Sequence, residues 1–290
     1  MPNLETLPED IYGLFDPDID HICDEDNLRV FAENLKDIFR QRLRKYKPPE
    51  TPLRFSSLGK PDRQIWFDAH PIKGGKEKLI PKTYVKFLYG DLLEQMLLLL
   101  AKEAGHNVEK EQAEVEDEGV YGHIDAVIDA VVVDCKSASP FGYQKLKEGK
   151  VLTDDPFGYV AQLSGYANIL TPGKAAAWLA IDKVSGDICV APLSSIVIRH
   201  HPPKERILHL KEVIKNDQIP ELCYQPVPDG KSGNLKLDIG CSYCSHKHRC
   251  YPDLRTFVYS TGPRFLTRVL RVPDVQEVTA DKEIVLDTDL

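Results

Sequence analysis

The chain has 290 residues, of which 42% are hydrophobic and 28% are charged, the composition of a folded globular protein. That apolar content is enough for a core, so a chain disordered throughout is excluded. No apolar run approaches the roughly 20 residues that a membrane-spanning helix needs. The formal net charge of −8 argues against a protein that coats nucleic acid through bulk positive charge, but not against an enzyme with a local basic surface.

The N-terminal residues MPNLE are acidic and lack the basic and apolar regions of a secretory signal, so we expect the protein in the cytoplasm. Thiols stay reduced there, and the seven cysteines favour metal ligation over disulfides.

Residues 1–52 are predicted to be an acidic lead-in followed by a basic amphipathic helix. Apolar residues recur at helical spacing from Asp26 to about Lys45, before a group of prolines. The far end of this helix contains Arg40, Arg44 and Lys45, which are either solvated cations favoured by the helix dipole or contacts for DNA.

Residues 53–216 are predicted to form an α/β core, and residues 217–290 a cysteine-containing region with an extended, acidic tail. In chain order the patterns predict a short helix within 53–68, a long helix over 83–104, strands at 108–115, 121–128 and 130–137, a helix over 158–170, a hairpin over 178–191 and a helix over 203–216.

The segment GHIDAVIDAVVVDCKSAS, residues 122–139, contains the residues best suited to chemistry. Alternation along a strand places Asp134 and Lys136 on one face and turns Cys135 toward the core. Burying an unpaired charge costs several kcal/mol, so the Asp–Lys pair must satisfy itself, bind a ligand, or both. Asp125, on the preceding strand, can lie close to Asp134, and two adjacent carboxylates favour a hard cation such as Mg²⁺ between them.

A structural salt bridge is the alternative, and it is the commoner explanation of an isolated D-x-K pattern. Further residues favour a site. Glu94 lies in the apolar part of the long helix, where it either faces water or needs a partner such as a metal. Gln162 and Tyr166 share a helix face, where they can orient a lysine or contact a phosphate.

Cys241, Cys244 and Cys250 form a C-x2-C-x5-C pattern, which is typical of zinc and iron–sulfur sites. A closed site needs a fourth ligand. Cys223 is the first candidate, with His246 or His248 behind it.

Together these motifs resemble the RecB-like branch of the PD-(D/E)XK nucleases, and within it the cysteine-bearing exonucleases: the CRISPR-associated RecB-like exonucleases, the AddB-type nucleases and their bacteriophage relatives. The resemblance covers roughly residues 53–255 and lies in the order of the motifs. It implies a restriction-endonuclease-like core, a mixed central sheet flanked by helices, with helical N-terminal and metal-binding C-terminal additions.

The resemblance also implies roles for the site residues. Asp125 and Asp134 would ligate a catalytic Mg²⁺ or Mn²⁺, with Glu94 near the same cation and the Cys135 carbonyl completing the shell. Many members of this branch have a histidine where this chain has Glu94.

Lys136 would orient the attacking water and stabilise charge in the transition state, and Gln162 and Tyr166 would support the lysine and the DNA backbone. The bound metal would lower the pKa of that water and neutralise the scissile phosphate.

The sequence departs from the family pattern in two places. Ile124 precedes Asp125 where proline is usual, and the upstream cysteine of the iron–sulfur members is missing from residues 56–63. The fourth ligand is therefore Cys223, Cys23 or, at a zinc site, a histidine. Both a [4Fe–4S] cluster and Zn²⁺ remain open, because thiolate sites accept either.

The implied function is a metal-dependent exonuclease that hydrolyses phosphodiester bonds at the ends of single- or double-stranded DNA. It would act in phage or bacterial replication, recombination or DNA degradation, within the bacterial host cell if phage-encoded, and alongside replication or recombination proteins. The alternatives are a CRISPR-adaptation nuclease and a non-catalytic DNA-end-binding or scaffold subunit with the same fold. No membrane association is expected, and the sequence gives no indication of oligomeric state.

Overall fold

The computed structural model describes residues 3–44, 53–72 and 81–278, and the chain divides into two compact units. The first unit comprises Met1–Gly59 and Pro81–Leu208, and the second comprises Lys60–Ile80 and His209–Leu290. These boundaries differ from the expected divisions after residues 52 and 216. The short helix α3 (Asp62–Ala69) belongs to the second unit, where Trp66 Nε1 donates a hydrogen bond of 2.6 Å to the Asn216 carbonyl.

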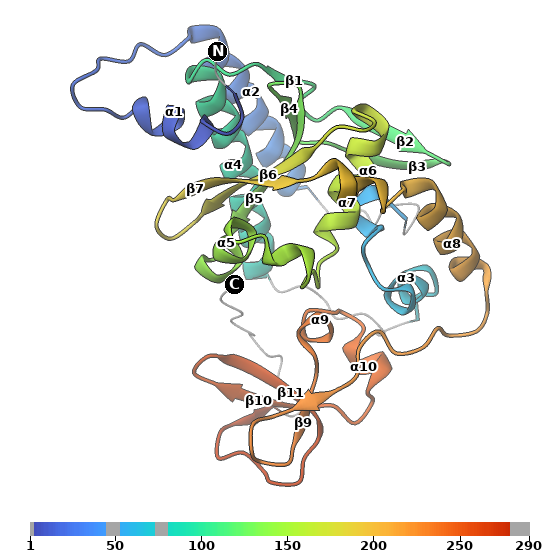
Figure 1. Ribbon diagram of the computed structural model, residues 1–290. Coiled ribbons are helices and arrows are strands. Elements are labelled where there is room, and N and C mark those ends of the chain that lie inside the picture. The colour runs from blue at the N-terminus through green and yellow to red at the C-terminus, as the bar shows by residue number, and fades with distance from the viewer. Residues whose placement is uncertain (1–2, 45–52, 73–80, 279–290) are drawn as a thin grey trace. The chain divides into compact units, whose positions relative to one another are not determined.

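A mixed five-stranded sheet lies at the centre of the first unit (Figure 1), and its strand order is β1-β4-β5-β6-β7. The strands are β1 (Val108–Glu109), β4 (Ala126–Ile128), β5 (Val131–Ala138), β6 (Ala176–Asp182) and β7 (Ile188–Leu193). Strands β5 and β6 are parallel and the other pairs are antiparallel. The first unit is therefore a mixed α/β fold, as predicted.

Helices pack on this sheet, and those between β5 and β6 make the crossover that a parallel strand pair requires. They are α4 (Pro81–Glu103), α5 (Pro140–Lys147), η2 (Lys150–Leu152) and α6 (Tyr159–Leu170). Leu97, Leu98 and Ala101 of α4 are buried against Val133 of β5 and Leu179 of β6. All seven residues of β6 are buried, which is the pattern of a strand covered on both faces. The remaining helices of this unit are η1 (Phe55–Ser57), α7 (Ser195–Arg199) and α8 (Pro203–Lys215), and the boundary between the units falls within α8.

The N-terminal segment is part of the core, so its prediction as a mere lead-in is wrong. Leu7 and Ile11 of α1 (Leu7–Gly13) are 0% and 1% exposed and pack in the same cluster as α4. Their spacing, together with Leu4, forms an apolar stripe within an otherwise acidic stretch. Helix α2 (Glu25–Arg42) follows, begins at the Asp24 side-chain cap and packs along α4.

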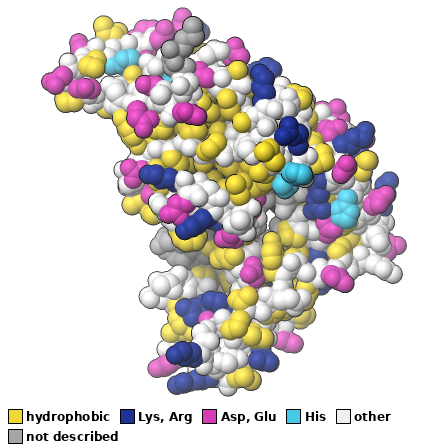
Figure 2. All heavy atoms as spheres, viewed as in Figure 1, with side chains coloured by type: hydrophobic (Ala, Val, Ile, Leu, Met, Phe, Trp, Pro, Cys, Tyr) yellow, Lys and Arg dark blue, Asp and Glu magenta, His cyan; other side chains and the backbone are white. Residues whose placement is uncertain are grey.

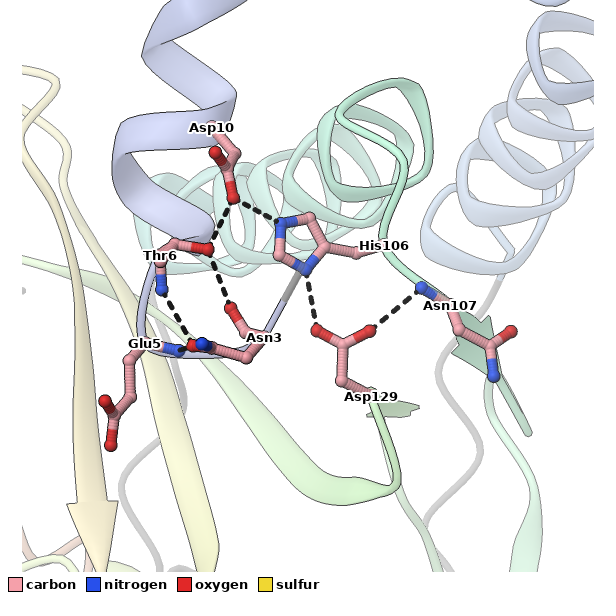
Figure 3. Close-up of polar contacts among 7 residues, drawn as sticks. All are labelled: Asn3, Glu5, Thr6, Asp10, His106, Asn107 and Asp129. Carbon is pink, nitrogen blue, oxygen red and sulfur yellow. Dashed lines mark hydrogen bonds and ion pairs between the residues drawn. The ribbon is translucent and has the colours of Figure 1, made fainter. Parts of the chain in front are cut away.

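A buried histidine joins α1 to the sheet (Figure 3). His106 Nδ1 lies 2.7 Å from Asp129 Oδ2, and its Nε2 lies 3.2 Å from Asp10 Oδ2 on α1. The Thr6 hydroxyl also donates to Asp10, at 2.6 Å. Asp129 and Ala130 form the β4–β5 turn with φ values of +49° and +65°, in the left-handed region that such two-residue turns require.

The predicted strand over 121–128 is two strands in different sheets. Its first part, β3 (Val120–His123), pairs with β2 (Glu114–Asp117) in a separate hairpin, and its second part is β4 of the central sheet. The predicted strand over 108–115 is likewise divided between β1 and β2, because Lys110 and Gln112 between them have positive φ values. Asp125 therefore lies at the junction of two sheets, outside either strand.

The second unit contains an antiparallel sheet where the sequence predicted only a cysteine region and an extended tail. Its order is β12-β10-β11-β9-β8, and its strands are β8 (Val227–Pro228), β9 (Leu235–Lys236), β10 (Arg255–Tyr259), β11 (Gly262–Arg268) and β12 (Glu277–Val278). The short helices α9 (Ile239–Ser242) and α10 (Lys247–Cys250) contain Cys241 and Cys250, and Cys244 lies between the two helices. In the part of the chain that the structure describes, no helix combines the length and apolar character needed to cross a membrane.

Candidate functional site

Asp134 and Lys136 lie on β5 with their side chains on the same face, as strand alternation predicted. Asp134 is 3% exposed, and its Oδ2 is in contact with the Lys136 ammonium group. The same ammonium lies 4.8 Å from the centre of the Tyr159 ring, at the start of α6. Cys135 points to the opposite face and packs against the core cluster. The ion pair is thus enclosed by protein on a central strand, where water screens it little.

Ala126 of β4 pairs with Val133 of β5. Continuing this antiparallel register by one residue places Asp125 opposite Asp134. Asp125 Oδ2 accepts a hydrogen bond of 2.6 Å from the backbone N–H of Cys135, which fixes the carboxylate beside the D-x-K strand. Burial raises the pKa of Asp125 well above its usual range, and the neighbouring Asp134 and Glu94 carboxylates raise it further. The site therefore contains more negative charge than Lys136 can balance.

Glu94 reaches this group from α4. Its Oε1 accepts hydrogen bonds from Gln112 Nε2 at 2.7 Å and from Gln95 Nε2 at 3.3 Å. Burial, followed by the nearby Asp91 and Asp134 carboxylates, raises the pKa of Glu94 to about 7. Of the two alternatives for Glu94, a water-facing acid and a partly enclosed one, this geometry matches the second.

Gln162 and Tyr166 share the face of α6 that meets Asp134. Gln162 Nε2 lies 3.5 Å from Asp134 Oδ1, at the long end of hydrogen-bond distances. Tyr166 is 3% exposed and stacks on Phe55, with ring centres 5.3 Å apart. Burial raises the pKa of the Tyr166 hydroxyl to about 12, although a hydrogen bond with Gln162 opposes the rise. Gln162 therefore connects the Tyr166 hydroxyl to the Asp134 carboxylate.

Two contacts in this site were not predicted from the sequence. Tyr159 lies three residues before Gln162, so helical spacing would have placed its ring on the same face. Gln112, which binds Glu94, lies in the irregular segment between β1 and β2 and has a positive φ of +51°. No periodic pattern marks such a position.

The donor atoms of this site fit a hard divalent cation. Glu94, Asp125 and Asp134 supply carboxylate oxygens, the ligands that Mg²⁺ and Mn²⁺ prefer, and burial together with neighbouring carboxylates raises the pKa values of Glu94 and Asp125. These oxygens do not all lie within 4.8 Å of one another. Among the described residues, the ligand atoms of only one group of three, His21, Cys23 and Glu103, are that close together. The acidic side chains must therefore rotate inward to share one ion.

The structure brings the four cysteines of the C-terminal region together. Cys223, Cys241, Cys244 and Cys250 line one cavity of the second unit, beside Arg63 and Phe67. Burial raises the pKa of the Cys241 thiol to about 12 and that of Cys244 to about 11, with further increases from the other sulfurs of the group. Two N–H groups point at sulfurs: Arg63 Nε lies 3.3 Å from Cys250 Sγ, and the His246 amide lies 3.4 Å from Cys244 Sγ.

The other residues considered as a fourth ligand lie elsewhere. The His246 ring faces away to Asp68, with 3.0 Å between Nε2 and Oδ1, and His248 is exposed. Cys23 belongs to the first unit, beside His21 and Glu103. Of the candidates, only Cys223 lines the cavity of the three clustered cysteines.

The predicted basic end of the N-terminal helix is only partly available for DNA. Arg40 pairs with Asp37 at 2.9 Å on the same helix, Arg44 is exposed, and Lys45 lies outside the described residues. On the face drawn in Figure 2, basic side chains are interspersed with acidic ones and form no continuous stripe. A DNA contact here would rest on a few exposed cations.

Neither the models of known protein families nor the sequences of curated proteins match this chain. Its function is therefore argued from the carboxylate–lysine group of the first unit and the four cysteines of the second.

Proposed function

We propose that the protein is a Mg²⁺- or Mn²⁺-dependent DNA exonuclease of the RecB-like branch of the PD-(D/E)XK nucleases. One observation is central to this proposal: a buried Asp134–Lys136 pair on a central strand, with Asp125 held opposite it by the Cys135 amide. A salt bridge alone would explain two of these residues. It leaves unexplained why Asp125 and Glu94 add two further carboxylates at a cost that their raised pKa values make plain.

The reaction is attack of a water on a backbone phosphate, with departure of the sugar oxygen. A cation held by Asp125, Asp134 and Glu94 would supply an activated water and neutralise charge on the phosphate. Lys136, whose ammonium is positioned between Asp134 and the Tyr159 ring, would hold the water and stabilise the charge that develops on the phosphoryl oxygens. Gln162, which also binds the Tyr166 hydroxyl, would keep Asp134 in its orientation.

The four cysteines support a metal centre that stabilises the second unit. Tetrahedral zinc with bonds of about 2.3 Å places its sulfurs about 3.8 Å apart. No three of these sulfurs in the described residues all lie within 4.8 Å of one another, so the thiols would draw together around a Zn²⁺ ion. A [4Fe–4S] cluster would take the same four thiolates.

Action at DNA ends, and a role in phage or bacterial replication, recombination or DNA degradation, rest on the resemblance in motif order. A CRISPR-adaptation nuclease would use the same site, and its neighbouring genes would distinguish it. A non-catalytic end-binding subunit is the alternative from another class, but such a protein gains nothing from four charged groups packed around a central strand.

The test is cleavage of end-labelled linear DNA, single- and double-stranded, with Mg²⁺ or Mn²⁺. Lys136→Met and Asp134→Asn should each lower the rate by at least about a hundredfold, the usual effect of removing one transition-state contact. Asp182→Asn is the matched control, since Asp182 is also a buried acid of the central sheet, 5% exposed, but only binds the Val184 amide.

Covalently closed circular DNA should resist the enzyme, because it has no ends. Wild-type protein that cleaves no DNA, or a Lys136→Met variant as active as Asp182→Asn, would contradict the proposal.

A further inference from the structure

Three potential metal ligands of different kinds meet where the loop over residues 14–24 lies against the end of α4. They are the His21 imidazole, the Cys23 thiol and the Glu103 carboxylate, and one ligand atom from each lies within 4.8 Å of the other two. No other set of three histidine, cysteine or acidic residues in the described parts of the chain is this close. The proposed nuclease site uses none of the three.

Glu103 is oriented toward this group from two sides. Its Oε1 accepts a hydrogen bond of 2.8 Å from the Asn27 side chain, and its Oε2 accepts one of 3.0 Å from the Asp24 amide. The Glu103 side chain is only 5% exposed, and these hydrogen bonds lower the pKa of its carboxyl group against the opposing effect of burial. Ligating carboxylates in metal sites are commonly fixed by outer hydrogen bonds of this kind.

The spacing of His21 and Glu103 also fits a metal. His21 Nε2 lies 3.1 Å from Glu103 Oε2. A tetrahedral ion with bonds of 2.0–2.1 Å separates two such ligands by about 3.3 Å. Cys23 is exposed on the same loop, so a rotation of its side chain can close the remaining distance to the other two.

We propose that His21 Nε2, Cys23 Sγ and Glu103 Oε2 form a binding site for Zn²⁺. Imidazole and thiolate ligands favour a borderline ion of this kind over Mg²⁺ or Ca²⁺. The fourth position belongs to water, because Asp24, whose amide binds Glu103, already uses its carboxylate to cap α2 through the Asp26 and Asn27 amides.

Occupation of this site would fasten the loop between α1 and α2 to the C-terminal end of α4. The His21–Glu103 hydrogen bond would be replaced by two bonds to one ion, and the exposed Cys23 would gain a fixed position. The effect is on the order of this loop and on stability, and it does not depend on nuclease activity.

The test is a titration of the full-length protein with Co²⁺ alone, after the cysteine cavity of the second unit has been loaded with its own metal. The absorption of bound Co²⁺ reports whether a thiolate is among its ligands. Wild type should bind one Co²⁺ more than Cys23→Ser, and the thiolate band of that ion should be absent from the variant. Asn27→Ala should weaken this site about ten- to hundredfold through the lost outer hydrogen bond. His123→Asn is the matched control, because His123 faces Glu114 at 3.7 Å without a thiol nearby.

A second measurement keeps the test independent of the spectrum. Zn²⁺ alone should raise the unfolding temperature of wild type and of His123→Asn, and it should not raise that of Cys23→Ser or His21→Asn. Equal Co²⁺ stoichiometry in wild type and Cys23→Ser, or an equal response of all four proteins to Zn²⁺, would overturn the proposal. Circular dichroism of the variants would verify that each is folded.

Discussion

Burial and the charge of neighbouring carboxylates raise the pKa values of Glu94 and Asp125 above the usual range of carboxyl groups. The pKa of Glu94 rises to about 7. An acid with such a pKa is partly protonated at neutral pH, but only its ionised form binds a cation. The residues that would hold the catalytic metal are thus the ones that release protons when it binds.

This gives a pH dependence with a definite sign. As the pH rises through about 7, Glu94 ionises and the apparent affinity for Mn²⁺ should increase, until it levels off above the pKa. Titrations with Mn²⁺ between pH 6 and 8 would measure this rise, and Glu94→Gln should flatten it. An affinity that is the same across this range would show that Glu94 does not take part.

The metal-free protein should show the opposite trend. The pKa of Glu94 is 4.5 in the unfolded chain and about 7 in the folded protein, so the folded state binds this proton more tightly. The stability that Glu94 contributes is therefore fully present below pH 4.5 and is lost as the pH rises through about 7. Urea unfolding in the presence of a chelator would follow this loss. Glu94→Gln should again remove the dependence.

Individual residues were predictable from the sequence where regular geometry decides their direction. Strand alternation separated Asp134 and Lys136 from Cys135, and helical spacing paired Gln162 with Tyr166. The position of Asp125 depends on the junction between two sheets, and the Gln112 contact depends on a positive φ. Neither follows from periodicity.

At the level of elements, α1 is held mainly by burial and by one histidine. His106 has no exposed side-chain surface and faces Asp10 of α1 and Asp129 of the β4–β5 turn. A neutral imidazole can donate to only one of these carboxylates, whereas the cation donates to both. The same residue therefore ties the first helix to a turn more than a hundred residues later.

Replacing His106 should loosen this helix. His106→Ala should lower the free energy of unfolding by about 1–3 kcal/mol, because it removes a fully buried side chain and its contacts with Asp10 and Asp129, and leaves Asp129 with the Asn107 amide alone. Urea denaturation would measure the change, and limited proteolysis should show earlier cleavage near α1. The exposed His123→Ala is the control, with an expected effect below about 0.5 kcal/mol. Equal stability of the two variants would argue against a role for the cluster.

Long, strongly patterned elements were the easiest to predict. Helix α4 and the β6–β7 hairpin lie where the sequence placed them. The C-terminal sheet was missed although Arg255–Tyr259 and Gly262–Arg268 flank a short Ser-Thr turn, because the cysteine pattern dominated that region. Helix α1 was not predicted, because Leu4, Leu7 and Ile11 are too few apolar residues to mark a helix in this acidic stretch.

For the whole molecule, the metal centre proposed at the four cysteines would make the stability of the second unit dependent on metal. Without metal the Cys241 and Cys244 thiols are neutral, since burial raises their pKa values and disfavours the thiolate, and no metal bond closes the cavity that they line. The cysteine centre should therefore affect the second unit and leave the first intact.

Cys244→Ser should release metal and produce an additional, low-temperature unfolding transition in calorimetry, while the main transition of the first unit stays unchanged. Cys23→Ser is the control, and it should keep the metal of the second unit. A visible spectrum of anaerobically purified protein identifies that metal, brown for iron–sulfur and colourless for zinc. Full stability of Cys244→Ser would contradict a structural role for this centre.

The division of the second unit along the chain sets an order of events on the ribosome. Helix α3 contains Ile65, Trp66 and Phe67, all buried in the folded protein, and the rest of its unit begins only at His209. At ordinary elongation rates of about 5–20 residues per second, the intervening segment takes roughly 7–28 s to synthesise. The strands of the first unit's central sheet are synthesised within that interval, while α3 is still without the rest of its own unit. Nascent chains of this protein should therefore need chaperone protection longest at a short segment near residue 66, until the residues after His209 have emerged.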